Sequence, residues 1–226
     1  MFPGSTPVFT SSRPPSSTDV SLVTVIAHPL VRHNLTKLRD ARTGPEEFRR
    51  GLGQVASLMV YEATRSFETR SVSVKTPLTR TRGAQLKHEV MLVPVLRAGL
   101  GMLGSILQLI PQARVGFIGL KRHERTLNAS VYHKSLPADL ASFEIILIDP
   151  MLATGGSVLA ALKLLYERGA QRVRLVSLVA SPEGIAKVHE RHPGLPRFTA
   201  AIDEKLNAQG YIVPGLGDAG DRLFGV

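Results

Sequence analysis

The chain has no cysteine and no tryptophan among its 226 residues. The absence of cysteine excludes disulfide bonds, metal sites built from thiolates and a cysteine nucleophile. Aromatic residues make up only 5% of the chain, and no basic motif with interleaved aromatics is present, which weighs against a nucleic-acid surface. Neither a bilayer-spanning apolar run nor a secretory signal pattern is found, so we expect a soluble, cytoplasmic protein with no membrane partner.

Acidic residues are also scarce, because 18 Asp and Glu face 28 Lys and Arg, for a formal net charge of +10 at pH 7. Such a charge is compatible with nucleic-acid binding, but the basic residues are spread along the chain instead of clustered. It is equally compatible with a basic cleft that attracts a substrate bearing several phosphates. We favour the second interpretation and expect no nucleic-acid partner.

The hydrophobic pattern predicts an α/β fold. A length of 226 residues with 43% hydrophobic residues suits one compact domain, expected over residues 22–226 after a flexible Ser/Thr/Pro-rich tail at 1–21. Apolar runs typical of buried strands alternate with segments of helical length, which predicts a mostly parallel twisted sheet flanked by helices on both faces. The expected strands are 88–95, 115–120, 145–148, 172–180 and 198–202, with 71–79 as an edge strand or a piece of a hairpin. The expected helices include 46–67, 182–192 and a helix that follows Met102 and ends at Ile110.

One strand, loop and helix organise the rest of the chain. The apolar run 145–148 ends at Asp149, and a small-residue turn leads from there into a second apolar segment of helical length. Glycines and the exposed amides at the start of a helix make an anion site, and an adjacent carboxylate suits a sugar hydroxyl or a hydrated cation. The pattern predicts a sugar-phosphate site, although an ordinary turn with Asp149 as a helix cap remains an alternative on spacing alone. No lysine follows the glycines, which excludes a Walker phosphate loop.

Three further segments are candidates for function. Arg97 follows the strand at 88–95, at the sheet edge where parallel sheets bind ligands, and a guanidinium there can hold a phosphate, although a plain surface arginine is the alternative. Residues 121–136 form the longest unpatterned interior segment, which is typical of a functional or disordered loop. Residues 203–226 are too rich in Gly, Pro and Asp for a helix or plain strand, yet their apolar residues predict an ordered irregular loop packed on the body.

Several strings resemble the type I phosphoribosyltransferases, in the form found in uracil phosphoribosyltransferases. They are HPLV at 28–31, YEAT at 61–64, VPVLRAGLGM at 93–102, DPMLATGGS at 149–157 and GYIVPGLGDAGD at 210–221. They occur in the family's order and extend the resemblance over nearly all of 25–225. The last string is the most specific, because many phosphoribosyltransferases share the phosphate loop.

The resemblance implies the type I fold with a mobile loop at 121–136 and a uracil-binding hood at 203–226. It also implies transfer of a phosphoribosyl group from 5-phospho-α-D-ribose 1-diphosphate (PRPP) to uracil, giving UMP and diphosphate in pyrimidine salvage. The implied PRPP-binding residues are Arg97, Arg122, Asp149, Pro150, Met151, Leu152, Ala153, Thr154, Gly155, Gly156, Ser157 and Asp218. Within that set Asp149, Arg97 and Arg122 are the implied catalytic residues, and Ile212, Gly217, Asp218 and Ala219 are the implied uracil-binding residues.

The same resemblance implies Mg²⁺ bound together with PRPP, with no direct protein ligand except Asp218 as a candidate. It further implies a homo-oligomer, as a dimer or tetramer, and raises GTP as an activator. Pro150 stands where most type I members carry a second acidic residue, a departure that uracil-specific members share. Two alternatives remain: a nucleotide-sensing regulator on this fold that binds RNA or DNA, and a phosphoribosyltransferase for another base.

Overall fold

The computed structural model describes residues 23–122 and 129–226. Within them, a central sheet of nine strands has the order β1-β11-β10-β8-β4-β6-β7, with β5 beside β4 and β9 beside β10. The strands are β1 (Val23–Val25), β4 (Glu89–Leu96), β5 (Arg114–Val115), β6 (Phe117–Arg122), β7 (Ala129–Ser135), β8 (Phe143–Ile148), β9 (Met151–Leu152), β10 (Arg172–Ala180) and β11 (Arg197–Ile202). The mostly parallel sheet predicted from the sequence is confirmed.

Parallel pairing places the carboxyl ends of the central strands at one edge. Strand β4 pairs in parallel with β8 and β6, and β10 pairs in parallel with β8 and β11, whereas β7 runs antiparallel to β6. In open parallel sheets this edge carries the ligand site. The loops that follow β4 and β8 therefore begin side by side.

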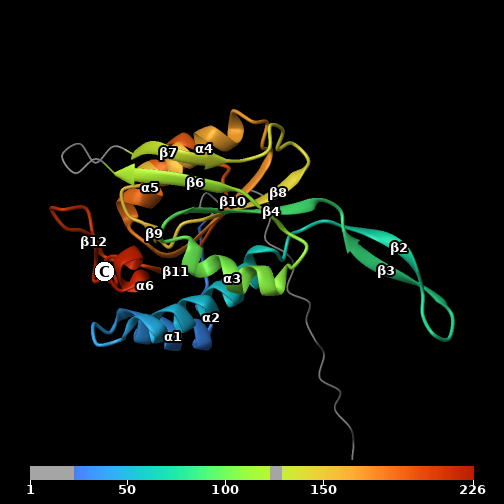
Figure 1. Cartoon of the computed structure of the whole chain (residues 1–226), viewed down its shortest axis with the longest axis horizontal. Helices are drawn as coiled ribbons and strands as arrows, with labels where there is room; N and C mark the ends of the chain where they lie inside the picture. Colours follow the sequence, from blue (N-terminus) through green and yellow to red (C-terminus); the bar gives the residue numbers. More distant parts are fainter. Residues whose placement is uncertain (1–22, 123–128) are drawn as a thin grey trace, which may run out of the picture.

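Helices cover both faces of the sheet (Figure 1). The helices α1 (Pro29–Arg39), α2 (Pro45–Ala63) and α3 (Leu100–Leu109) lie on one face, and α4 (Gly156–Tyr166) and α5 (Pro182–Arg191) lie on the other. Two apolar clusters form the core, and side chains alternate between them along β8. Ile146 and Ile148 belong to one cluster, and Ile145 and Leu147 belong to the other. No helix within the described ranges is long and apolar enough to cross a membrane.

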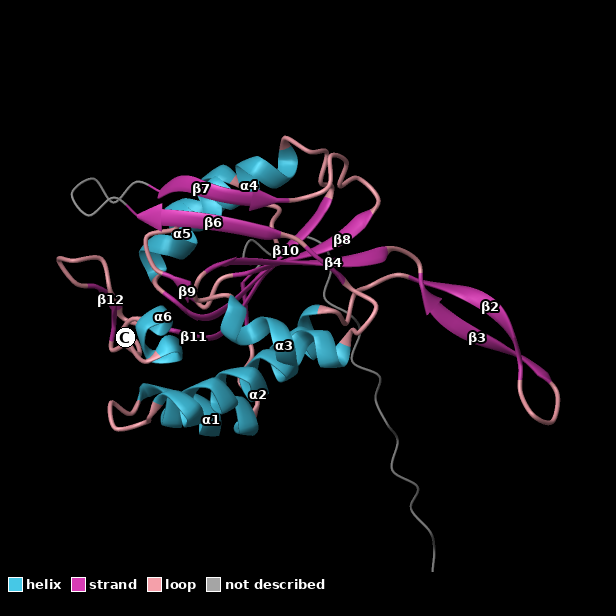
Figure 2. Cartoon of the chain, in the orientation of Figure 1, coloured by secondary structure: helices cyan, strands magenta, loops and turns pink. Residues whose placement is uncertain are grey.

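Two segments differ from their sequence-based prediction. Residues 71–79 were predicted to be an edge strand or a piece of a hairpin. The structure has a complete antiparallel hairpin of β2 (Thr69–Lys75) and β3 (Arg80–Leu86), which projects from the body (Figure 2), and β3 itself was not predicted. Part of the loop predicted at 121–136 is strand β7 instead. Both strands missed in this way are exposed along most of their length, so they lack the buried alternation that identifies a strand. The tail at 1–21 and residues 123–128 lie outside the described residues.

Residues 203–226 are ordered, as predicted, but they are not wholly irregular. They contain a short hairpin of β12 (Lys205–Leu206) and β13 (Ile212–Val213), followed by helix α6 (Ala219–Phe224). Helix α6 was not predicted, and its caps explain why it forms. The Asp218 Oδ1 atom accepts hydrogen bonds from Gly220 N at 2.8 Å and Asp221 N at 3.0 Å, and Gly225 ends the helix with φ of +74°.

Candidate active site

The carboxyl edge of the sheet and residues 203–226 together line a cleft of about 1110 Å³. This is large enough for a sugar phosphate and a base at once. Its lining joins segments that are far apart in the sequence: Arg97 and Ala98 after β4, Asp149, Ala153 and Ser157 after β8, and Ile212, Gly217, Asp218 and Ala219 near the C-terminus. Most of the site residues expected from the sequence therefore share one cavity.

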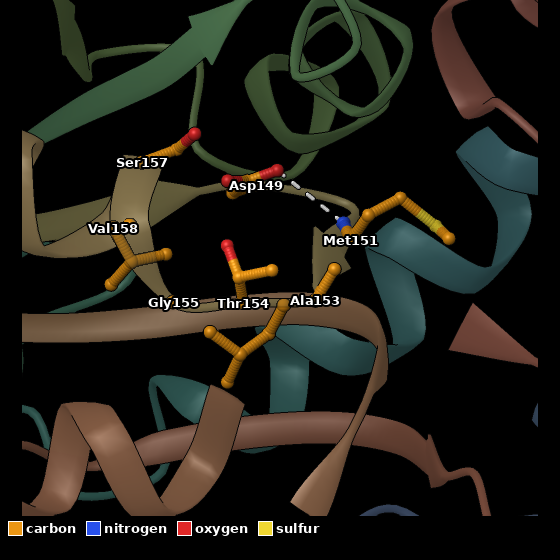
Figure 3. A pocket seen from close by; sticks show the side chains of 9 residues that line it. Asp149, Met151, Ala153, Thr154, Gly155, Ser157 and Val158 are labelled. Atoms are coloured by element: carbon orange, nitrogen blue, oxygen red, sulfur yellow. Dashed lines mark hydrogen bonds between the residues drawn. The ribbon is translucent and has the colours of Figure 1, made fainter. Parts of the chain in front are cut away.

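The loop between β8 and α4 surrounds a small hollow at one end of this cleft (Figure 3). Gly155 has φ of +75°, and a Cβ atom there would lie 3.2 Å from the Gly184 carbonyl oxygen, so the turn requires glycine. Gly155 is the N-cap residue of α4 and has no side chain with which to cap the helix. The side chains of Thr154, Ser157 and Asp149 lie around the hollow (Figure 3). Amides of the first helical turn and two hydroxyls suit an anion such as phosphate.

The loop's shape is fixed from the side of α5. The Ala153 amide donates to the Met151 carbonyl at 2.9 Å, and the Ala153 carbonyl accepts from Ser181 Oγ at 2.6 Å. The same Ser181 Oγ accepts from Gly184 N at 2.9 Å and caps α5. The Ala153 amide therefore already has a partner within the loop's own turn.

Asp149 lies where the small hollow meets the larger cleft, since it lines both. Asp149 is only 8% exposed, and its Oδ1 atom accepts a hydrogen bond from Met151 N at 3.3 Å. This contact orients the carboxylate between the phosphate loop and the rest of the cavity. The position suits a ligand whose phosphate occupies the hollow and whose sugar extends toward the base.

Arg97 lies between β4 and α3, after a cis peptide bond between Leu96 and Arg97. Its side chain is 61% exposed, and Nη2 lies 3.7 Å from Asp221 Oδ1 of α6. The guanidinium therefore lies at the cleft and can contact a ligand. Arg122 ends β6, but its side chain is outside the described residues, so its contact with diphosphate stays a prediction.

The backbone expected to hold uracil is tightly folded. Ile212 is buried, and the Val213–Pro214 peptide bond is cis. Gly215 and Gly217 have φ of +57° and +78°, and a Cβ atom on Gly215 would lie 2.1 Å from the Ile212 carbonyl oxygen. The conformations of the two glycines restrict the course of the main chain past the cleft.

Helix α6 is anchored to the body by Arg222. Its guanidinium donates to the carbonyl oxygens of Leu38, Leu216 and Asp40 and lies 4.5 Å from the centre of the Phe48 ring. Burial lowers the pKa of Arg222, and the charge of nearby Asp40 opposes that effect. These contacts place α6 against the end of α1.

Sequence reasoning missed three side chains that also line the cleft: Lys121, Tyr132 and Tyr211. Lys121 and Tyr132 come from β6 and β7, in the segment predicted to be a loop. A strand there would have indicated that alternate side chains face the cavity. Tyr211 lies within residues 210–221, which resemble the family, but a tyrosine in this string did not by itself indicate a residue that lines the cleft.

Carboxylates suited to a divalent cation are few. Within the described ranges, no group of three or more His, Asp or Glu side chains could hold a metal alone. Asp149 and Asp218 line the same cleft, although Asp218 already uses Oδ1 to cap α6. One or two carboxylates fit Mg²⁺ of the kind bound mainly by substrate phosphates and water.

Comparison with known proteins agrees with this geometry. Residues 25–226 match the family model described as uracil phosphoribosyltransferase. A curated protein of that name from Clostridium tetani is 55% identical over 207 residues, covering 91% of this chain and 99% of the relative. Another protein of that name, from Dictyoglomus thermophilum, is 50% identical over 205 residues, covering 90% of this chain and 99% of the relative.

Solved structures give the same result for the fold. The AQ2163 protein from Aquifex aeolicus superposes with a TM-score of 0.87 at 38% identity, over 90% of this chain and 98% of that one. The adenine phosphoribosyltransferase from Leishmania donovani superposes with a TM-score of 0.57 at 15% identity, over 82% of this chain and 86% of that one, which supports the fold alone. The chain therefore has the type I phosphoribosyltransferase fold and belongs to the uracil phosphoribosyltransferase family.

Proposed function

We propose that this protein is a pentosyltransferase that converts uracil and PRPP to UMP and diphosphate, a step of pyrimidine salvage. One observation carries the proposal: a single cleft joins the phosphate loop at 149–158 to the backbone at 210–220 that resembles the uracil hood. A ligand with its 5-phosphate in the hollow can present its anomeric carbon toward that backbone. The family assignment independently supports the same reaction.

Catalysis in this proposal is positional and electrostatic. Diphosphate leaves the anomeric carbon as uracil attacks, and positive charge develops on the ribose ring, so no side-chain nucleophile is needed. Amides of the first turn of α4 hold the 5-phosphate, and Asp149 binds the ribose hydroxyls and favours the developing cation. Arg97 and Arg122 stabilise the departing diphosphate. Asp218 would meet Mg²⁺ or the ribose, and a Mg²⁺ ion bound with PRPP would neutralise diphosphate charge.

Base selection is assigned to the main chain of Ile212, Gly217 and Ala219. Uracil presents an acceptor, a donor and an acceptor at O2, N3–H and O4, whereas cytosine reverses the pattern at N3 and C4. A fixed backbone that matches uracil leaves polar groups unpaired against cytosine. Each such mismatch costs on the order of 1–3 kcal/mol.

The direct test is UMP formation from uracil and PRPP, with and without Mg²⁺, beside cytosine, hypoxanthine, adenine and orotate. We expect product from uracil only, and only with Mg²⁺, because the base must match the hood and the diphosphate charge must be neutralised. Product from a different base would keep the phosphate loop and refute the assignment of residues 210–221. No product with any base, together with salt-sensitive binding of RNA or DNA on filters, would favour the regulator instead.

The proposal includes a homo-oligomer, as a dimer or tetramer. The β2–β3 hairpin projects from the body (Figure 2). Leu78, in the turn between the two strands, is 96% exposed. An isolated two-stranded hairpin is marginally stable in water, so a second copy of the chain is the partner expected to cover it. Light scattering after gel filtration should give at least twice the monomer mass, and a monomer at all concentrations would refute this part.

Two further parts of the proposal follow from the family resemblance. We include a cytoplasmic location and activation by GTP. The UMP assay repeated with added GTP measures activation directly. Unchanged kinetics would remove GTP from the proposal without touching the reaction itself.

A further inference from the structure

An ion pair outside the cleft holds the backbone assigned to uracil. Arg39 is the last residue of α1, and Asp203 directly follows β11. Arg39 Nη2 lies 2.5 Å from Asp203 Oδ1, and Arg39 Nη1 lies 2.8 Å from Oδ2, which makes the pair bidentate. The Asp203 side chain is only 4% exposed and the Arg39 side chain 25%. Neither residue lines the cleft.

Both partners also bond to the backbone of Gly215. Arg39 Nη1 donates to the Gly215 carbonyl at 2.7 Å, and the Gly215 amide donates to Asp203 Oδ2 at 2.9 Å. Gly215 lies between Ile212 and Gly217, two of the residues assigned to the base. The ion pair therefore fixes both the amide and the carbonyl of Gly215.

The pair is itself fixed to the sheet. The Asp203 amide donates to the Ala180 carbonyl at 2.8 Å, at the carboxyl end of β10. Arg222 holds the next residue of the turn, because it donates to the Leu216 carbonyl at 3.0 Å. The turn at Gly215 and Leu216 is thus held from the end of α1 and from the sheet edge at once.

We propose that Arg39 and Asp203 are positioning residues for base recognition: by binding both polar groups of Gly215, they keep the neighbouring main-chain groups in register with uracil. This inference rests on the proposed function. An isolated buried ion pair often adds little stability over apolar residues. Its hydrogen bonds to the turn give this pair a role that stability alone does not explain.

The experiment compares steady-state kinetics of wild-type protein and Asp203→Asn. Asparagine keeps the size, but it removes the charge and one of the two equivalent acceptor oxygens. We expect the KM for uracil to rise about tenfold, because that factor corresponds to the free energy of about one hydrogen bond. The KM for PRPP should change less than about twofold. Arg39→Lys keeps the charge but loses the bidentate geometry, so we expect a smaller rise of about threefold. If Asp203→Asn does not fold, Arg39→Lys provides the same test.

Two control variants separate positioning from stability. Arg42→Gln removes the exposed ion pair between Arg42 and Asp40, which lies beside the same end of α1. Because neither side chain of that pair bonds to Gly215, we expect both KM values to stay unchanged. Glu144→Gln weakens the ion pair between Glu144 and Arg174, whose side chains are buried, as that of Asp203 is. This variant should have a lower melting temperature and an unchanged KM for uracil.

A fall in melting temperature of Asp203→Asn and Arg39→Lys with an unchanged KM for uracil would overturn the inference. An equal rise in both KM values would also overturn it, because the turn would then not act on the base alone. Failure of wild-type protein to use uracil would instead refute the proposed function, so the two failures are distinguishable.

Discussion

The Asp149→Asn variant is expected to lose about 10²–10³-fold in kcat, with the KM for uracil changed less than about twofold. Fixed charges directed at a developing charge typically contribute that much to turnover. Asp149 is 8% exposed and is oriented by the Met151 amide, so its carboxylate is largely shielded from solvent and held in one direction. Asparagine keeps the shape and one hydrogen-bond acceptor but removes the charge that favours the ribose cation.

Single-turnover rates of UMP formation at saturating PRPP measure this effect without interference from product release. Asp139→Asn is the matched control, because Asp139 is exposed and only accepts a hydrogen bond from Ala141 N at 2.9 Å before β8. Its kinetics should match wild type. Near-normal turnover of Asp149→Asn would remove Asp149 from its proposed role.

The Glu144→Ala variant is expected to lose about 3–5 kcal/mol of unfolding free energy, the usual result of removing one partner of a buried ion pair. Arg174 Nη2 donates to Glu144 Oε2 at 2.9 Å, and both side chains are at most 10% exposed. Burial already lowers the pKa of Arg174, and Glu144 is the charge that opposes this shift. Without Glu144 the guanidinium keeps the Ala63 carbonyl and the Phe67 ring but has lost its buried counter-charge.

Urea unfolding monitored by circular dichroism measures the loss. Glu68→Ala is the control, since Glu68 pairs with Lys87 at 2.6 Å with both side chains more than half exposed, and should change the free energy by less than about 1 kcal/mol. UMP formation per folded molecule should stay normal in both variants. A loss below about 1 kcal/mol for Glu144→Ala would show that Arg174 is satisfied by its remaining contacts.

The sequence predicted the parts of the molecule that have a local pattern. The buried strand before Asp149 and the turn after it were predicted because an apolar run, glycines and a helix follow one another directly. Strands β3 and β7 were missed because exposed strands carry no hydrophobic alternation, and α6 was missed because its stability comes from the Asp218 cap. The Arg39–Asp203 pair could not be predicted, since its members are 164 residues apart and neither lies in a motif.

The anchoring of α6 also bears on how the site forms during synthesis. The phosphate loop consists of neighbouring elements, β8 and α4, and needs only short loop closure. The proposed base site lies next to helix α6, which Arg222 holds through the Leu38 carbonyl, a separation of 184 residues. Contacts of such separation form late, because the chain between them must first be made and ordered. On the ribosome, we therefore expect the nascent chain to contain the elements of the proposed phosphate site before those of the proposed base site.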